Sequence, residues 1–174
     1  MKPYFILCLV LLLVVAQLSA QQSNEDPTLE VQQQDILGTG AFIQQIGNAN
    51  EATITQLQRG NTRNSAVITQ EGNNNTAHIA QQGNANYSIV TQTGNGNVYD
   101  LLLTGSDNRT SILQLGNDNS IVQRLRDFIG VDVNFVQIGD DNAIIQDLQG
   151  ISGRSFEITQ RGNGLRLEIT VENY

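Results

Sequence analysis

The side chains that could serve as nucleophiles, acids, bases or metal ligands are few and lie far apart in this sequence. Cys8 is the only cysteine and His78 the only histidine among the 174 residues. On an alternating strand His78 has the opposite parity to Ala77 and Ile79, so we expect it to point outward and to be a poor metal ligand by itself. Serine and threonine are plentiful, but no histidine partner and no nucleophile-elbow sequence accompanies them. We therefore predict no catalytic site, no cofactor and no metal, and a protein that is not an enzyme.

Two short polar segments resemble ligand loops but fit turns better. The sequences Asn-Asp-Asn at 117–119 and Asp-Asp-Asn at 140–142 could suggest calcium. The calcium-binding β-roll, however, uses a nine-residue repeat, whereas the glycines here recur every 11 residues. The Gly-Asn-Gly sequences at 94–96 and 162–164 are followed by no lysine and by no predicted helix, so they are not phosphate loops.

The composition argues against nucleic-acid binding and favours β-aggregation. The chain holds 20 Gln and 19 Asn, only 15% charged residues, and a formal net charge of −8. Lys2 is the only lysine, so no basic cluster could neutralise nucleic-acid phosphates. With 39% hydrophobic residues the chain is not a simple disordered tail, and enrichment in Gln and Asn favours β-aggregation.

The N-terminus is predicted to be a targeting segment. Residues 1–20 combine a basic start, an apolar run over 5–16 and a small residue at the end, which is typical of a secretory signal peptide. The run is too short to span a membrane, since about 20 apolar residues are needed. Cleavage near Ala20 would remove the only lysine and the only cysteine, so no disulfide could form. Residues 21–40 are predicted to be a flexible polar leader, and residues 41–174 the structured part.

A repeat organises everything after the leader. Glycines recur every 11 residues from Gly72 to Gly116, most have Gln two positions before them, and many have Asn three positions after. The turn glycines assigned from this pattern are Gly47, Gly72, Gly83, Gly94, Gly105, Gly116, Gly139 and Gly162. The residues assigned to structural ladders and self-assembly are Gln45, Gln56, Gln70, Gln81, Gln92, Gln114, Gln137, Gln160, Asn50, Asn75, Asn97, Asn119 and Asn142.

Each 11-residue half predicts one strand and one turn. Residues of one parity share a strand face, such as Ala52, Ile54 and Gln56, and Gly and Asn tolerate the positive φ angles of tight turns. The fold class is therefore all-β, a β-solenoid of about six two-strand coils with a period of 22–23 residues. The predicted coils are 41–57, 65–82, 87–104, 109–125, 133–148 and 155–171. We expect Gln70, Gln92, Gln114, Gln137 and Gln160 to form one ladder, and Asn75, Asn97, Asn119 and Asn142 another.

The pattern Gln-x-Gly-x-x-Asn-x-Ala-x-x-x-Gln, at 45–56 and 70–81, resembles the repeat of the curli subunits, or curlins. The resemblance implies a secreted bacterial protein that polymerises into functional amyloid fibres on the cell surface and in the biofilm matrix. It also implies periplasmic chaperones, passage through an outer-membrane secretion pore, and a related subunit that acts as nucleator or major subunit. Three features depart from the familiar repeat: Asn64, Asn86 and Asn108 replace its serine, Leu103 replaces a glutamine, and an insertion at 124–132 breaks the period.

These observations lead to one function and two alternatives. We expect a self-assembling subunit of an extracellular fibre, or fimbrium, which serves cell adhesion and aggregation. The alternatives are a secreted β-solenoid adhesin that does not polymerise and the minor nucleating subunit of such fibres. An ice-binding solenoid needs a regular Thr-x-Thr array, which Thr53 and Thr55 begin but His78 and Ala80 break. The coils are too short for a β-helix lyase, and neither end of the solenoid shows an obvious cap in the sequence.

Overall fold

The computed structural model describes residues 12–19, 29–36 and 39–171, and the named elements in these ranges are all β-strands. No helix in this part of the chain is long and apolar enough to cross a membrane. The strands are β1 Leu12–Ser19, β2 Leu29–Ile36, β3 Thr39–Ile46, β4 Glu51–Gln58, β5 Ser65–Glu71, β6 Thr76–Asn84, β7 Tyr87–Thr93, β8 Val98–Ser106, β9 Arg109–Leu115, β10 Ser120–Ile129, β11 Asp132–Ile138, β12 Ala143–Gln149, β13 Ser155–Arg161 and β14 Arg166–Val171.

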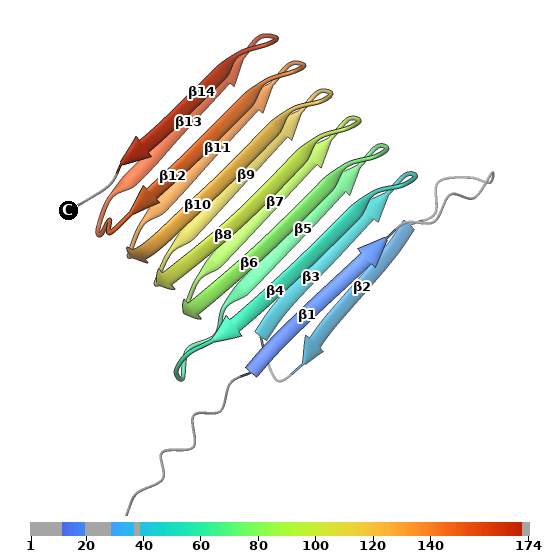
Figure 1. The fold of residues 1–174 in the computed structure, drawn as a ribbon. Helices are drawn as coiled ribbons and strands as arrows, with labels where there is room; N and C mark the ends of the chain where they lie inside the picture. Colours follow the sequence, from blue (N-terminus) through green and yellow to red (C-terminus); the bar gives the residue numbers. More distant parts are fainter. Residues whose placement is uncertain (1–11, 20–28, 37–38, 172–174) are drawn as a thin grey trace, which may run out of the picture.

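The strands form two facing sheets of seven strands each (Figure 1). Sheet A has the order β1-β4-β6-β8-β10-β12-β14, and sheet B the order β13-β11-β9-β7-β5-β3-β2. From β3 onward the chain alternates between the sheets, so that each pair of consecutive strands completes one coil. Neighbouring strands of these coils pair in parallel and place Gln70 beside Gln45 and Gln92 beside Gln70. The predicted β-solenoid of about six two-strand coils is confirmed.

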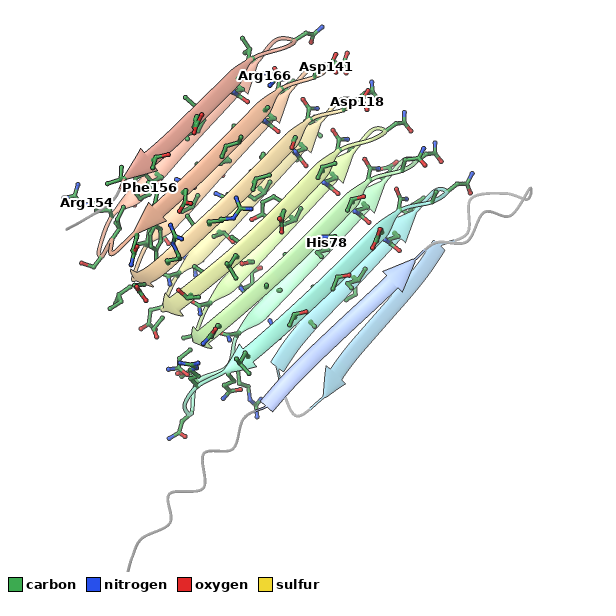
Figure 2. The ribbon with its side chains drawn as sticks, in the orientation of Figure 1. His78, Asp118, Asp141, Arg154, Phe156 and Arg166 are labelled. Carbon is green, nitrogen blue, oxygen red and sulfur yellow. The ribbon has the colours of Figure 1, made fainter. Side chains whose placement is uncertain are left out.

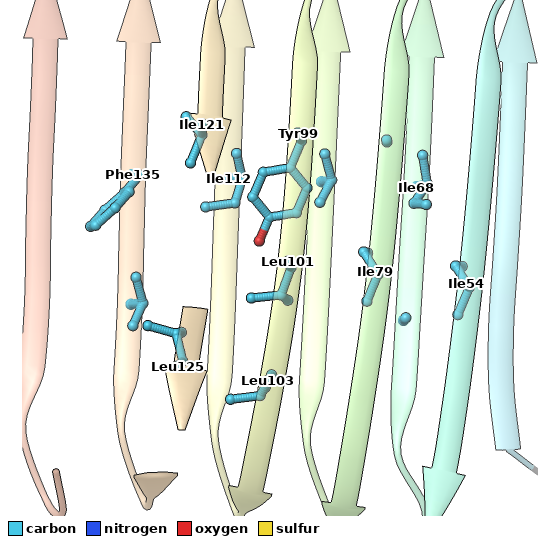
Figure 3. Packing of buried hydrophobic residues seen from close by; sticks show 14 of the residues in the cluster. Ile54, Ile68, Ile79, Tyr99, Leu101, Leu103, Ile112, Ile121, Leu125 and Phe135 are labelled. Carbon is cyan, nitrogen blue, oxygen red and sulfur yellow. The ribbon is translucent and has the colours of Figure 1, made fainter. Parts of the chain in front are cut away.

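Strict alternation of burial explains why these residues form strands. On β4, for example, Ala52, Ile54 and Gln56 are fully buried while the residues between them face outward. Figure 3 shows the inward apolar side chains between the two sheets: Ile54, Ile68 and Ile79 at the N-terminal coils, and larger residues such as Tyr99 and Phe135 farther along. The inward apolar residues are thus alanine and isoleucine in the first coils and mostly larger residues in the middle.

The turns between strands bring backbones from successive coils into close contact. Gly94 has a φ of +121°, and a Cβ atom placed on it would lie 1.9 Å from the carbonyl oxygen of Gly116 in the next coil. Non-glycine residues with positive φ, such as Asn74 and Asp118, occupy the tight part of the same turns. The recurrence of glycine in the sequence therefore follows from the stacking distance of the coils.

Two irregularities in the period are absorbed without breaking the stack. The first coil is three residues longer than the next, and its extra residues lie in the exposed segment 59–63. The insertion expected at 124–132 is absorbed by β10, which runs to Ile129 and shifts register between Leu125 and Phe128. Asp127 takes a positive φ of 57° at this bulge, and Phe128 becomes fully buried.

The N-terminal end of the solenoid is covered, in contrast to the expectation that neither end is capped. Strand β1 pairs antiparallel with β4, and strand β2 pairs antiparallel with β3 (Figure 1). Strand β2 lies within residues 21–40, which the sequence suggested to be a flexible leader. An edge strand only needs backbone groups to pair, so it does not have to carry the glycine period by which the coils are recognised. Removal of the predicted signal peptide would remove β1 and open the edge of β4.

The turn geometry predicts that Gly94→Ala destabilises the solenoid far more than Gly130→Ala. Both glycines have positive φ, but a Cβ on Gly130 would have no atom within 4 Å. We expect about 1–2 kcal/mol of strain for Gly130→Ala and about 3 kcal/mol or more for Gly94→Ala, whose Cβ would collide with a backbone oxygen. Denaturant unfolding of freshly prepared, unpolymerised protein measures the difference. Equal losses for the two variants would show that coil contact does not require glycine.

Candidate assembly interface

A continuous chain of buried amides runs through sheet B. Each Gln Nε2 donates to the Oε1 of the Gln in the next coil, over 2.7–3.0 Å, and all six residues are at most 7% exposed. The members are Gln45, Gln70, Gln92, Gln114, Gln137 and Gln160. From Gln70 onward Nε2 also donates to a backbone carbonyl of sheet A, such as that of Thr76 for Gln92 at 3.0 Å. The amides thus satisfy each other and tie the two sheets together.

A second chain of amides runs through the turns that follow the glycines. Asn75 donates its backbone N–H and its Nδ2 to Asn50 Oδ1, at 3.0 and 3.2 Å, and donates Nδ2 also to the carbonyl of Gly94 at 2.8 Å. The same arrangement joins Asn50, Asn75, Asn97, Asn119 and Asn142. Each of these asparagines therefore connects adjacent coils, and the structure brings the two expected sets together as two separate ladders.

Sequence analysis missed two further ladders. Asn64, Asn86 and Asn108 stack in the opposite arcs, with Asn86 Nδ2 3.1 Å from Asn64 Oδ1. On the exposed turns a series of backbone N–H groups donates to the Oδ1 atoms of Asn73, Asn95, Asn117, Asp140 and Asn163. Both ladders could have been found from the spacing of their members, which recur every 22–25 residues. The comparison with a serine-containing repeat treated Asn64, Asn86 and Asn108 as departures from that repeat.

The inner face of sheet A keeps its amides only in part. Gln56 donates to Gln81 at 2.9 Å, but Gln81 then bonds Ser88 Oγ at 2.7 Å, because Leu103 occupies the next position. In the coil of β8 the Tyr99 hydroxyl donates to Gln123 Oε1 at 2.8 Å. Burial raises the pKa of Tyr99 well above its usual range, so this hydroxyl remains a donor at all ordinary pH values. Sheet A is thus the more apolar side of the core.

His78, Asp140 and Asp141 lie on an exposed strand face and in the turns. His78 points outward, with 45% of its side chain exposed, and its Nε2 lies 3.6 Å from Glu51 Oε1 (Figure 2). No group of three or more His, Cys, Asp or Glu residues that could hold a metal occurs among the described residues. Asp140 Oδ1 accepts the backbone N–H of Asn117 at 2.8 Å, and Asp141 takes a positive φ, so both residues serve the turns.

The two ends of the solenoid differ in what they leave unpaired: amide oxygens at the N-terminal end and apolar side chains at the C-terminal end. At the N-terminal end the Oε1 atoms of Gln45 and Gln56 are buried and have no hydrogen-bond partner. At the C-terminal end no other strand among the described residues pairs with the outer edge of β13 or β14. The inward side chains of Phe156, Leu167 and Val171 therefore remain partly exposed. The C-terminal end can therefore accept further strands, whereas at the N-terminal end β1 and β2 already occupy the edges of β4 and β3.

The comparison with family models decides what the repeat is. The curlin associated repeat matches residues 57–83 and 72–98, which include β5, β6 and β7. Residues 57–98 of this chain therefore carry the curlin associated repeat. No curated protein and no solved structure matches the chain. The two matched segments overlap over residues 72–83, which include most of β6.

The amide ladder predicts that Gln92→Leu destabilises the protein by about 1–3 kcal/mol for each group left without a partner. Leucine would remove the acceptor of Gln70 Nε2 and the donor to Gln114 Oε1, both fully buried. The outward Gln44 of β3 serves as the control, since Gln44→Leu leaves the ladder intact. Denaturant unfolding measures both variants. Equal stability losses would mean that the buried amides contribute nothing specific.

Proposed function

We propose that this protein is a secreted structural subunit that self-assembles head to tail into extracellular curli-type fibres. The observation that carries the proposal is the unfinished glutamine ladder. It begins with a buried acceptor without a partner, Gln45 Oε1, and ends with Gln160, whose Nε2 has reached only the carbonyl of Ala143. In a stack of identical chains Gln160 of one copy would donate to Gln45 of the next.

The register of the coils defines how sheet B would continue from one copy to the next. Extending the observed pairing would place β13 beside β3, with Ile158 next to Ile43 and Gln160 next to Gln45. The exposed turn ladder would continue as well, because Asn163 is the residue that follows Asp140 in that ladder and Asn48 is the first. Sheet B thus offers a matched partner at each of these positions.

In sheet A the residues that would meet at the junction between two copies are mainly charged and apolar. Placing β14 beside β4 brings Arg166 opposite Glu51, two exposed residues of opposite charge, and Ile169 next to Ile54. Val171 would lie beside Gln56 and offers no donor to its unpaired Oε1. The junction is therefore amide-matched in sheet B and mainly apolar and ionic in sheet A.

Two features support an extracellular setting. The N-terminal segment has the pattern of a secretory signal peptide, and the repeat is that of curli-type subunits. We propose that the fibres contribute to a biofilm matrix and to adhesion and aggregation of cells. Export through an outer-membrane pore, assisted by periplasmic chaperones, and nucleation by a related subunit belong to the same proposal.

One observation favours a second candidate, a secreted solenoid adhesin that remains monomeric. Strand β2 occupies the edge of β3 on which a second copy would dock. A permanently covered edge blocks strand addition, as natural β-proteins require when they stay monomeric. The two candidates differ in whether β2 leaves that edge.

Incubation of the secreted chain, residues 21–174, distinguishes the two candidates. A fibre-forming subunit is expected to produce unbranched fibres with a meridional reflection near ~4.8 Å, the spacing between stacked strands. Size-exclusion chromatography coupled to light scattering would follow the loss of monomer. A chain that stays monomeric over a wide range of concentration and time contradicts the fibre proposal and supports the adhesin.

The matched junction predicts that Gln160→Glu slows fibre growth about tenfold or more. The carboxylate can still accept from Gln137 Nε2, but it would face the acceptor Gln45 Oε1 of the next copy without a proton to donate. Thr159→Glu adds the same charge to the exposed face of the same strand and is the control. Seeded growth rates measure both variants. Equal slowing would assign the effect to charge alone and not to the ladder.

A further inference from the structure

The edge of β3 is the place where an internal strand and a second copy of the chain compete. Strand β2 pairs along the whole of β3, from Leu29 beside Ile46 to Ile36 beside Thr39, and the two strands run antiparallel. All pairs between the coils are parallel. Strand β2 is therefore not a seventh coil but a cover of different geometry (Figure 1).

The cover leaves the edge of β3 incompletely bonded. Gln45 is 1% exposed beneath it, yet its Oε1 has no hydrogen-bond partner. Every other glutamine of the sheet B ladder accepts from the preceding one. A parallel strand that carries glutamine at this position would satisfy the backbone and the amide together, which β2 does not. The occupant that fits best is β13 of a second copy.

We propose that β2 is an internal guard strand, which holds the monomer in a non-polymerising state and which β13 of a second copy displaces when a junction forms. This inference rests on the proposed fibre function and concerns its regulation. Each head-to-tail junction uses one β3 edge, so each added subunit requires one displacement. The guard is joined to β3 through residues 37–38 only. Such a short connection gives it a high effective concentration at the edge and favours the guarded state in dilute solution.

The neighbouring strand provides a starting point for the exchange. Once the predicted signal peptide has been removed, β1 is gone and nothing in the rest of the described chain pairs with the outer edge of β4. Strand β14 of a second copy can bind there, with Arg166 opposite Glu51. This first contact holds β13 close to β3, so that the exchange of β2 for β13 becomes intramolecular within the complex.

A variant with a weakened guard tests the proposal. Gln32→Pro combined with Gln33→Pro removes two consecutive backbone N–H groups of β2, so at least one that faces β3 is lost whatever the parity of the strand. All of residues 39–171 stay unchanged. We expect the lag before fibre growth of the secreted chain to become about fivefold shorter or more, because a guard that lacks a hydrogen bond is released more often. Asn24→Pro combined with Glu25→Pro, outside β2, is the control and is expected to keep the lag of the parent chain.

A locked guard tests the same proposal in the opposite direction. Gln33 and Phe42 are register partners, and opposite residues of antiparallel strands are about 4.5–5.5 Å apart at Cα, within the range of a disulfide. The secreted chain contains no other cysteine. Gln33→Cys combined with Phe42→Cys should abolish fibre growth when oxidised and restore it on reduction. Thiol titration verifies the closed bond.

The outcomes separate this inference from the fibre proposal. If the parent chain forms fibres but neither the proline pair nor the oxidised cysteine pair changes the lag, the guard is wrong and the fibre function stands. If neither the parent chain nor the proline variant ever forms fibres, the fibre proposal itself fails. Fibres from the proline variant alone would support both.

Discussion

The structure depends on one constraint: a buried side-chain amide must find its hydrogen-bond partners in the coil above or below it. Gln92, between the inner faces of the two sheets, and Asn97, in a turn, are both fully buried. An unpaired amide there costs free energy, whereas an identical amide one coil away offers a donor and an acceptor at the right height. This requirement keeps Gln and Asn at fixed positions and makes glycine necessary where successive turns touch.

The same constraint gives the molecule a direction. Glutamine amides of sheet B donate toward the C-terminal end, as from Gln70 to Gln92, while asparagine amides of the turns donate toward the N-terminal end, as from Asn97 to Asn75. A ladder of directed bonds cannot be complete at both ends. It leaves an acceptor at Gln45 and a donor at Gln160, and these two ends complement each other only when copies stack with the same polarity.

The periodic part of this fold could be predicted from the sequence, and the aperiodic part could not. The glycine spacing and the alternation of residues such as Ala66, Ile68 and Gln70 predicted the coils, their number and the two main ladders. The bulge at 125–128 could be located as an insertion, but not the burial of Phe128, which depends on how the extra residue turns the strand. Strand β2 carries none of the repeat, because an antiparallel edge strand needs only backbone pairing.

The two sheets divide the requirements of a stacking protein between them. In sheet A the positions equivalent to Gln81 in later coils hold Leu103, Leu125 and Leu148, and Gln123 and Gln146 form the one further amide pair there among the described residues. Sheet B keeps its glutamine in all six coils, and a shift by one residue would turn these glutamines to the outer face and break the ladder. Sheet B therefore determines register, and sheet A supplies apolar burial. It is consistent with this division that the strand β2 covers the end of sheet B, because an error of register at that edge would be carried into every copy added afterwards.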